Sequence, residues 1–252
     1  MRFKTNKYLL ASAALAGCMA ASIGTAAFAA DTWTGFYVGA HVGTTNGSAT
    51  WSDIVVSSAP AQDLPGAFSN SQPSGGLIGI HAGYNRQLMG PMVIGIEGNV
   101  NVSPFSGGTK GSSTCFGNSN YGDYAAECTS EIKSTYDVAV RVGFSPVDKL
   151  LVYAKAGPAK AKTRFIPAGQ IGPVSGSFYH PDTSTVSSHL IGFGIDMAVS
   201  DQWTVGAEYN SQDFGTKMSF QPSGNLNNYN PAFTAKADVR LNTLVMRVSR
   251  RY

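Results

Sequence analysis

The stretch Tyr136-Asp137-Val138-Ala139-Val140-Arg141-Val142-Gly143-Phe144 decides the fold class of this chain. Successive side chains of a β-strand point to opposite faces, so the apolar and aromatic residues here, at every second position, share one face. The other face carries Asp137 and Arg141 among small residues. The eight steps from Tyr136 to Phe144 span about 26 Å along a strand, or about 20 Å once it is tilted. This length suits a strand that crosses the apolar layer of a membrane.

The same alternation continues along the chain and predicts eight strands. Helical periodicity is hard to find after the first thirty residues, and no later apolar run is long enough for a transmembrane helix. The pattern therefore indicates an all-β protein. The expected strands are residues 35–43, 76–87, 93–103, 132–145, 150–162, 187–199, 203–214 and 235–252.

The connections between these strands alternate in length. Short turns are expected at residues 89–91, 146–149 and 200–202, and long loops near residues 44–74, 104–130, 166–186 and 215–234. A soluble sandwich has no reason to sort its connections in this way, whereas a membrane barrel has short periplasmic turns and long external loops. The predicted fold is an eight-stranded antiparallel up-and-down transmembrane β-barrel with short periplasmic turns and long extracellular loops.

Aromatic residues mark both ends of the outward faces. Such residues form girdles at the two interfaces of a membrane barrel, because the ring is apolar while its polar edge prefers water. At the periplasmic rim the expected girdle is Phe36, Tyr84, Phe144, Trp203 and Tyr252, and at the outer rim it is Tyr136 and Tyr209.

The remaining charges of the strands fall on the inward faces. Eight strands leave an interior just wide enough for side chains, so buried charges must pair or hydrogen-bond across the lumen. His41 and His81 also point inward, and we expect them to bond to acids. The predicted lumen network is Glu97, Asp137, Asp196 and Glu208 with Arg141, Lys155 and Arg247.

The first 29 residues are typical of a secretory signal peptide. A basic start with Arg2, Lys4 and Lys7 precedes an apolar run that ends on Ala27-Phe28-Ala29. We expect export through the Sec pathway, removal of residues 1–29 and a barrel over residues 30–252. Residues 15–18 read Leu-Ala-Gly-Cys, so lipidation of Cys18 stays an alternative.

Removal of this segment also changes the charge balance. The whole chain has 18 Lys and Arg against 15 Asp and Glu, and loss of the three bases of the segment leaves 15 against 15. No basic field remains to indicate a nucleic-acid partner.

Cys115 and Cys128 are the cysteines that remain outside the first 29 residues. They flank a segment rich in Gly, Asn, Ser and Tyr, and the periplasm is oxidising, so a disulfide within this loop is expected. Two thiols without nearby His or acid make a poor metal site. We therefore expect neither a metal nor another cofactor.

Both ends of the chain resemble the RopB-like family of small alphaproteobacterial outer-membrane proteins. The resemblance rests on Asp31-Thr32-Trp33-Thr34-Gly35-Phe36-Tyr37-Val38-Gly39, on Gly206-Ala207-Glu208-Tyr209, and on Asn242-Thr243-Leu244 with Arg250-Arg251-Tyr252. It implies an eight-stranded barrel of the cell outer membrane with roles in envelope integrity and host contact, and some members bind haemin or form small pores. The Cys115/Cys128 segment does not map onto the family, and Tyr252 stands where Phe is commoner.

The leading prediction is a structural surface barrel without enzyme activity. Its expected partners are outer-membrane lipid and lipopolysaccharide, the periplasmic chaperones and barrel-assembly machinery during biogenesis, and a host-surface ligand or haemin at the loops. A solute pore is one alternative, although it would need a looser lumen or more strands. Haemin binding is another, with His180 as the candidate ligand. A lipid-A-modifying enzyme is a remote third, because Ser187 and His189 share an outward face but no acid there is evident to orient the His.

Overall fold

The computed structural model describes residues 32–57, 62–63, 69–88, 90–103, 109–116, 124–171, 177–179, 182–214, 216–219 and 232–252 of the chain. The expected signal peptide and Cys18 lie outside these residues. The described part contains thirteen strands. They are β1 Gly35–Ser57, β2 Gln62–Asp63, β3 Ser69–Ser71, β4 Ser74–Gln87, β5 Met92–Val102, β6 Thr109–Phe116, β7 Tyr124–Val147, β8 Leu150–Ile171, β9 Ser177–Tyr179, β10 Asp182–Ala198, β11 Trp203–Asp213, β12 Thr216–Ser219 and β13 Ala232–Arg251.

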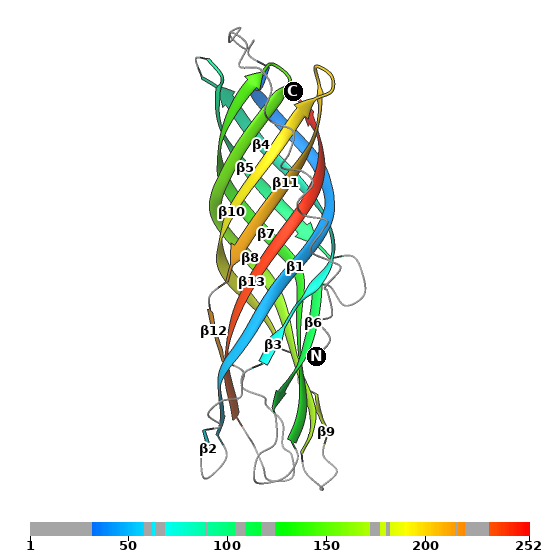
Figure 1. The fold of residues 1–252 in the computed structure, drawn as a ribbon, viewed down its shortest axis with the longest axis vertical. Coiled ribbons are helices and arrows are strands. Elements are labelled where there is room, and N and C mark those ends of the chain that lie inside the picture. Colours follow the sequence, from blue (N-terminus) through cyan, green and yellow to red (C-terminus); the bar gives the residue numbers. More distant parts are fainter. Residues whose placement is uncertain are drawn as a thin grey trace, which may run out of the picture.

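Eight of these strands form a closed antiparallel barrel (Figure 1). The pairing runs β1-β4-β5-β7-β8-β10-β11-β13, and β13 pairs back onto β1. This seam extends from the pair Tyr37 and Arg251 to the pair Ser57 and Ala232. Closure satisfies the backbone groups of every strand, which lipid requires because it offers no hydrogen bonds. The predicted eight-stranded up-and-down barrel is confirmed.

Four of the five shorter strands continue the sheet beyond the end of a barrel strand. β6 pairs with β7 where β5 has ended, and β12 pairs with β13 where β11 has ended. β3 pairs with β1 beyond the point where β4 begins, and β9 pairs with β8 beyond the point where β10 begins. Figure 1 shows β2, β9 and β12 toward the end of the barrel away from the C-terminus.

The short turns lie where the sequence predicts them, but the long connections do not begin where it predicts. β1 continues to Ser57, β7 begins at Tyr124, β8 continues to Ile171 and β10 begins at Asp182. Residues 44–57, 124–130, 166–171 and 182–186, expected in loops, are therefore strand. The physical reason is that these stretches leave the apolar layer. Their hydrogen-bond ladder continues, but the apolar alternation that reveals a strand in the sequence stops.

The outward surface of the barrel is apolar on all eight strands. Large apolar side chains are exposed there, among them Ile80 (63 %), Val140 (59 %) and Phe193 (59 %). A contiguous apolar surface of this kind on a closed barrel is a lipid contact surface. None of the described residues forms a helix long and apolar enough to span a membrane.

The residues expected in the aromatic girdles lie on this outward surface. Phe36, Phe144, Trp203 and Tyr252 lie close to the turn end, and Tyr136 and Tyr209 lie farther along their strands. Tyr84 is half-buried, and its ring centroid lies 4.8 Å from that of Phe36.

Val140 and Val147 provide a test of where the apolar layer lies. Both are 59 % exposed on β7, but Val140 is midway between Tyr136 and Phe144 and Val147 is at the turn. We expect V140R to lower the free energy of unfolding in lipid vesicles by about 2–4 kcal/mol, and V147R by about 1 kcal/mol or less, because the charge penalty is largest at the midplane. Urea unfolding of the refolded barrel measures both values. Equal effects would contradict this placement of the layer.

Candidate functional site

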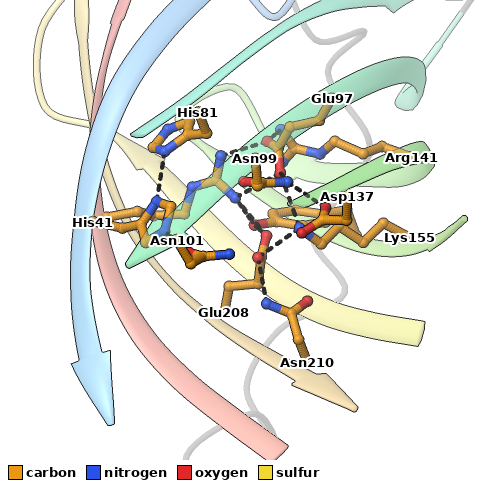
Figure 2. Close-up of polar contacts among 12 residues, drawn as sticks. His41, His81, Glu97, Asn99, Asn101, Asp137, Arg141, Lys155, Glu208 and Asn210 are labelled. Atoms are coloured by element: carbon orange, nitrogen blue, oxygen red, sulfur yellow. Dashed lines mark hydrogen bonds and ion pairs between the residues drawn. The ribbon is translucent and has the colours of Figure 1, made fainter. Parts of the chain in front are cut away.

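Six barrel strands contribute one side chain each to a charged cluster in the lumen. The alternation of each strand decides this orientation, because the neighbours of each charge along the strand face lipid. Figure 2 shows Glu97, Arg141, Lys155 and Glu208 converging from different strands. The set is Glu97 of β5, Arg141 of β7, Lys155 of β8, Asp196 of β10, Glu208 of β11 and Arg247 of β13, and all six are buried.

Glu97 lies at the centre of this network and is 0 % exposed. Its carboxylate is 3.0 Å from Arg141 Nη1, 3.0 Å from Lys155 Nζ and 2.5 Å from Arg247 Nη2. It also accepts hydrogen bonds from Tyr37 Oη (2.8 Å) and Asn99 Nδ2 (3.2 Å). An isolated buried carboxylate would be prohibitively unstable, and these donors compensate for the water that Glu97 has lost.

Glu208 and Asp196 complete the charge balance. Glu208 Oε1 lies 2.7 Å from Lys155 Nζ, and Glu208 also pairs with Arg247 and accepts from Tyr153 Oη (2.7 Å). Asp196 Oδ2 lies 2.8 Å from Arg141 Nη2. Three carboxylates therefore face three cations in one connected cluster. The charges of this cluster therefore compensate one another.

Asp137, the seventh residue of the predicted network, lies beside this cluster. Its carboxylate accepts a hydrogen bond from Asn99 Nδ2 (2.7 Å), and Asn99 also donates to Glu97. Among the described side chains the structure gives Asp137 no ion pair. An amide therefore separates the fourth acid from the balanced group.

Two tyrosines that sequence reasoning did not include hold the arginines in place. The guanidinium carbon of Arg141 lies 3.7 Å from the ring centroid of Tyr153 and 5.4 Å from that of Tyr37. A planar guanidinium stacks well on an aromatic face. In the sequence both tyrosines fall at inward-facing positions of the alternation, and this was the signal for the arrangement.

Glycines on neighbouring strands make room for these rings. A Cβ placed on Gly194 would lie 2.3 Å from Tyr153 Cζ, and one placed on Gly83 would lie 2.4 Å from Tyr37 Oη. Real Cβ atoms do not approach so closely, and the Tyr153 ring is only 3 % exposed. These two positions therefore require glycine for the close approach of a ring.

The histidine pair corrects an expectation. Among the described side chains His41 and His81 bond to no acid, because Arg and Lys occupy Glu97, Asp196 and Glu208, and Asn99 bonds to Asp137. The two Nδ1 atoms lie 3.1 Å apart, and His41 Nε2 meets Asn101 Oδ1. His81 Nε2 lies 2.7 Å from Ser249 Oγ. Figure 2 shows this pair at the side of the charged cluster.

Trp33 closes the lumen at the turn end, and sequence reasoning missed this role. It forms a buried cluster with Val93, Leu151, Tyr153 and Ala198. Its Nε1 donates to Ser145 Oγ (3.1 Å), and its backbone N donates to Gln87 Oε1 (3.2 Å). Trp33 precedes the first strand, where the alternation gives no signal of its place.

The cysteine and histidine candidates of the loops are outside or at the edge of the described part. Cys115 lies at a register shift in β6, and Cys128 of β7 pairs with Ser113 of β6, but nothing is described of either side chain. The disulfide stays a prediction. His180, the candidate haemin ligand, lies outside the described residues. Ser187 and His189 are both exposed on β10.

The described side chains contain no group of three or more His, Cys, Asp or Glu that could hold a metal ion. The lumen holds a packed polar core, and the cluster of Trp33 forms an apolar layer at its turn end. On its outer side Leu77 and Leu241 are also buried.

Comparison with known proteins places this barrel in a family. Residues 11–249 match the family model described as outer membrane protein beta-barrel domain. The chain belongs to this family. The protein is located in the cell outer membrane, as its two ends and its strand pattern predict.

Two relatives come from alphaproteobacteria. The 31 kDa outer-membrane immunogenic proteins of Brucella melitensis biotype 1 and Brucella suis biovar 1 are each 27 % identical to the chain over 188 residues, 73 % of this chain and 72 % of the relative. They support the expected membership of a small alphaproteobacterial outer-membrane barrel family.

Two solved structures are similar to this chain to different degrees. OprG from Pseudomonas aeruginosa has a TM-score of 0.55 at 10 % identity, covering 87 % of this chain and 96 % of that chain. Neisserial surface protein A has a TM-score of 0.40 at 14 % identity, covering 87 % and 98 %. At these identities the likeness to OprG concerns the fold alone.

Glu97 and Asp137 form a matched pair for testing the charge cluster. We expect E97Q to lower the free energy of unfolding by about 3–5 kcal/mol, because it leaves three buried cations facing two carboxylates. D137N should change it by about 1 kcal/mol or less, since it removes a charge that pairs with no described cation. Urea unfolding in lipid vesicles distinguishes the two. An equal loss in both variants would contradict the central role of Glu97.

Gly194 and Gly98 test the packing of Tyr153. We expect G194A to destabilise the barrel by about 1–3 kcal/mol, because the new methyl group collides with a ring that cannot move. G98A should have little effect, since the nearest atom to its Cβ would be 3.8 Å away. The heat-dependent gel shift gives the melting temperature of each variant. A G194A barrel as stable as G98A would show that the Tyr153 ring is free to move.

Proposed function

We propose that this protein is a non-conducting structural barrel that anchors an extracellular β-extension at the cell surface. In this role it contributes to envelope integrity and to contact with a host or the environment, without enzyme activity. The observation that carries the proposal is the fully buried Glu97 cluster, whose charges compensate one another inside the barrel.

The lumen supports the non-conducting part of the proposal. Ion flow needs a continuous file of water, and an eight-stranded barrel has room only for side chains. Here the turn end is filled by Trp33, Leu151 and Tyr153, and the middle by the charge cluster. A pore would require both layers to separate.

The strand extension supports the surface-contact part. β7 begins at Tyr124, twelve residues before Tyr136. Those residues correspond to about 40 Å of strand beyond the outer aromatic position. The Brucella relatives carry the description immunogenic, which fits a protein whose outer part is accessible to antibodies.

Single-channel recording tests the proposal. The mature protein is refolded in lipid, and its insertion is checked by the heat-dependent gel shift. We expect no stepwise current in a planar bilayer, with or without reductant, under conditions in which a general porin conducts. Steady openings of the inserted protein would overturn the proposal and make solute diffusion the function.

A further inference from the structure

A cluster of exposed lysines lies just beyond the apolar surface. On β8 the outward residues Val152, Ala154 and Ala156 are followed at the same phase by Lys160 and Lys162, both exposed. Lys160 is the register partner of Tyr136, and Lys162 pairs with Ser134. The outward face of the barrel therefore changes from apolar to basic at the level of an outer aromatic residue.

A β-bulge adds a third lysine to this cluster. The register between β7 and β8 shifts between Ile132 and Ser134, and Lys133 is the extra residue. Lys133 is exposed while Ile132 and Ser134 are buried. Residues opposite each other on paired strands are about 5 Å apart, and residues two apart on one strand about 7 Å. The three ammonium groups can therefore reach one bound anion.

The described part of the barrel supplies no counter-charge to these lysines. Among the described side chains the structure gives Lys133, Lys160 and Lys162 no ion pair. The nearby Glu131 lies 3.9 Å from Arg164, which already compensates its charge. On the β11–β13 side, by contrast, Arg240 Nε pairs with Asp213 at 3.2 Å.

We propose that Lys133, Lys160 and Lys162 bind the phosphate groups of lipid A, the membrane anchor of lipopolysaccharide in the outer leaflet. The cluster lies within three strand residues of Tyr136, about 10 Å, at the height where acyl chains end and phosphorylated head groups begin. Thr185 and Ser187 of β10, both exposed, pair with Lys162 and Lys160 and add hydroxyl donors. The site needs only the membrane location of the barrel and holds whether or not the lumen conducts.

The test compares two triple variants of equal charge change in lipid nanodiscs. K133Q/K160Q/K162Q removes the cluster, and R86Q/K149Q/R250Q removes three exposed bases at the turn end. Native mass spectrometry and a fluorescent lipid A titration measure binding of bisphosphorylated lipid A. We expect the first variant to lose about tenfold or more in affinity, since basic residues near an anionic surface each contribute to binding. The second should bind like the wild type.

Further arms identify the ligand chemistry. Dephosphorylated lipid A should bind at least about tenfold more weakly to the wild type, and K133R/K160R/K162R should retain binding because it keeps the charge. The gel shift confirms that each variant is folded. Equal binding by the wild type and the lysine variant would overturn the proposal, as would equal binding of dephosphorylated lipid A. Inorganic phosphate at millimolar concentration and a sulfated sugar are tested as competitors of the fluorescent lipid A. If either displaces it as well as unlabelled lipid A does, the proposal fails and the lysines bind soluble anions.

Discussion

The interior of this barrel depends on the carboxylate of Glu97, which has no access to water. Its charge has to be compensated inside a space just wide enough for side chains. The compensation comes from Arg141, Lys155 and Arg247 on three other strands. Each of these cations then requires its share of acid, which Asp196 and Glu208 supply. The cluster thereby connects six strands across the lumen in addition to their backbone ladder.

Much of this fold is predictable from sequence because lipid and lumen impose opposite demands on alternate residues. That contrast is sharp from Tyr136 to Phe144, and it gives the strand, its faces and its neighbours. It fades beyond the membrane, where the outward residues of β1 such as Asn46 and Ser48 are polar. The apolar alternation therefore does not predict that β1 continues to Ser57 or that β7 begins at Tyr124.

The pairing inside the lumen is harder to foresee than its composition. Alternation places His41, His81 and Asp137 inward, but which atoms meet depends on strand stagger and on which acids the arginines have already taken. The histidines meet each other, and among the described side chains Asp137 accepts its hydrogen bond from Asn99. Trp33 lies before the first strand, where no period applies, and its place in the mouth follows only from the three-dimensional closure of the barrel.

The seam between the first and last strands has a consequence for assembly. Tyr37 pairs with Arg251, and Tyr252 N donates to Phe36 O at 2.9 Å, so the two ends of the barrel sequence meet directly. Contacts between residues so far apart in the sequence form slowly, because the chain loses the entropy of closing a long loop before the contacts stabilise it. Until the last strand arrives, the free edge of β1 cannot be tolerated in lipid. Insertion and completion of the chain are thus coupled, and a barrel shortened by its final strand would be left with an open edge along its whole length.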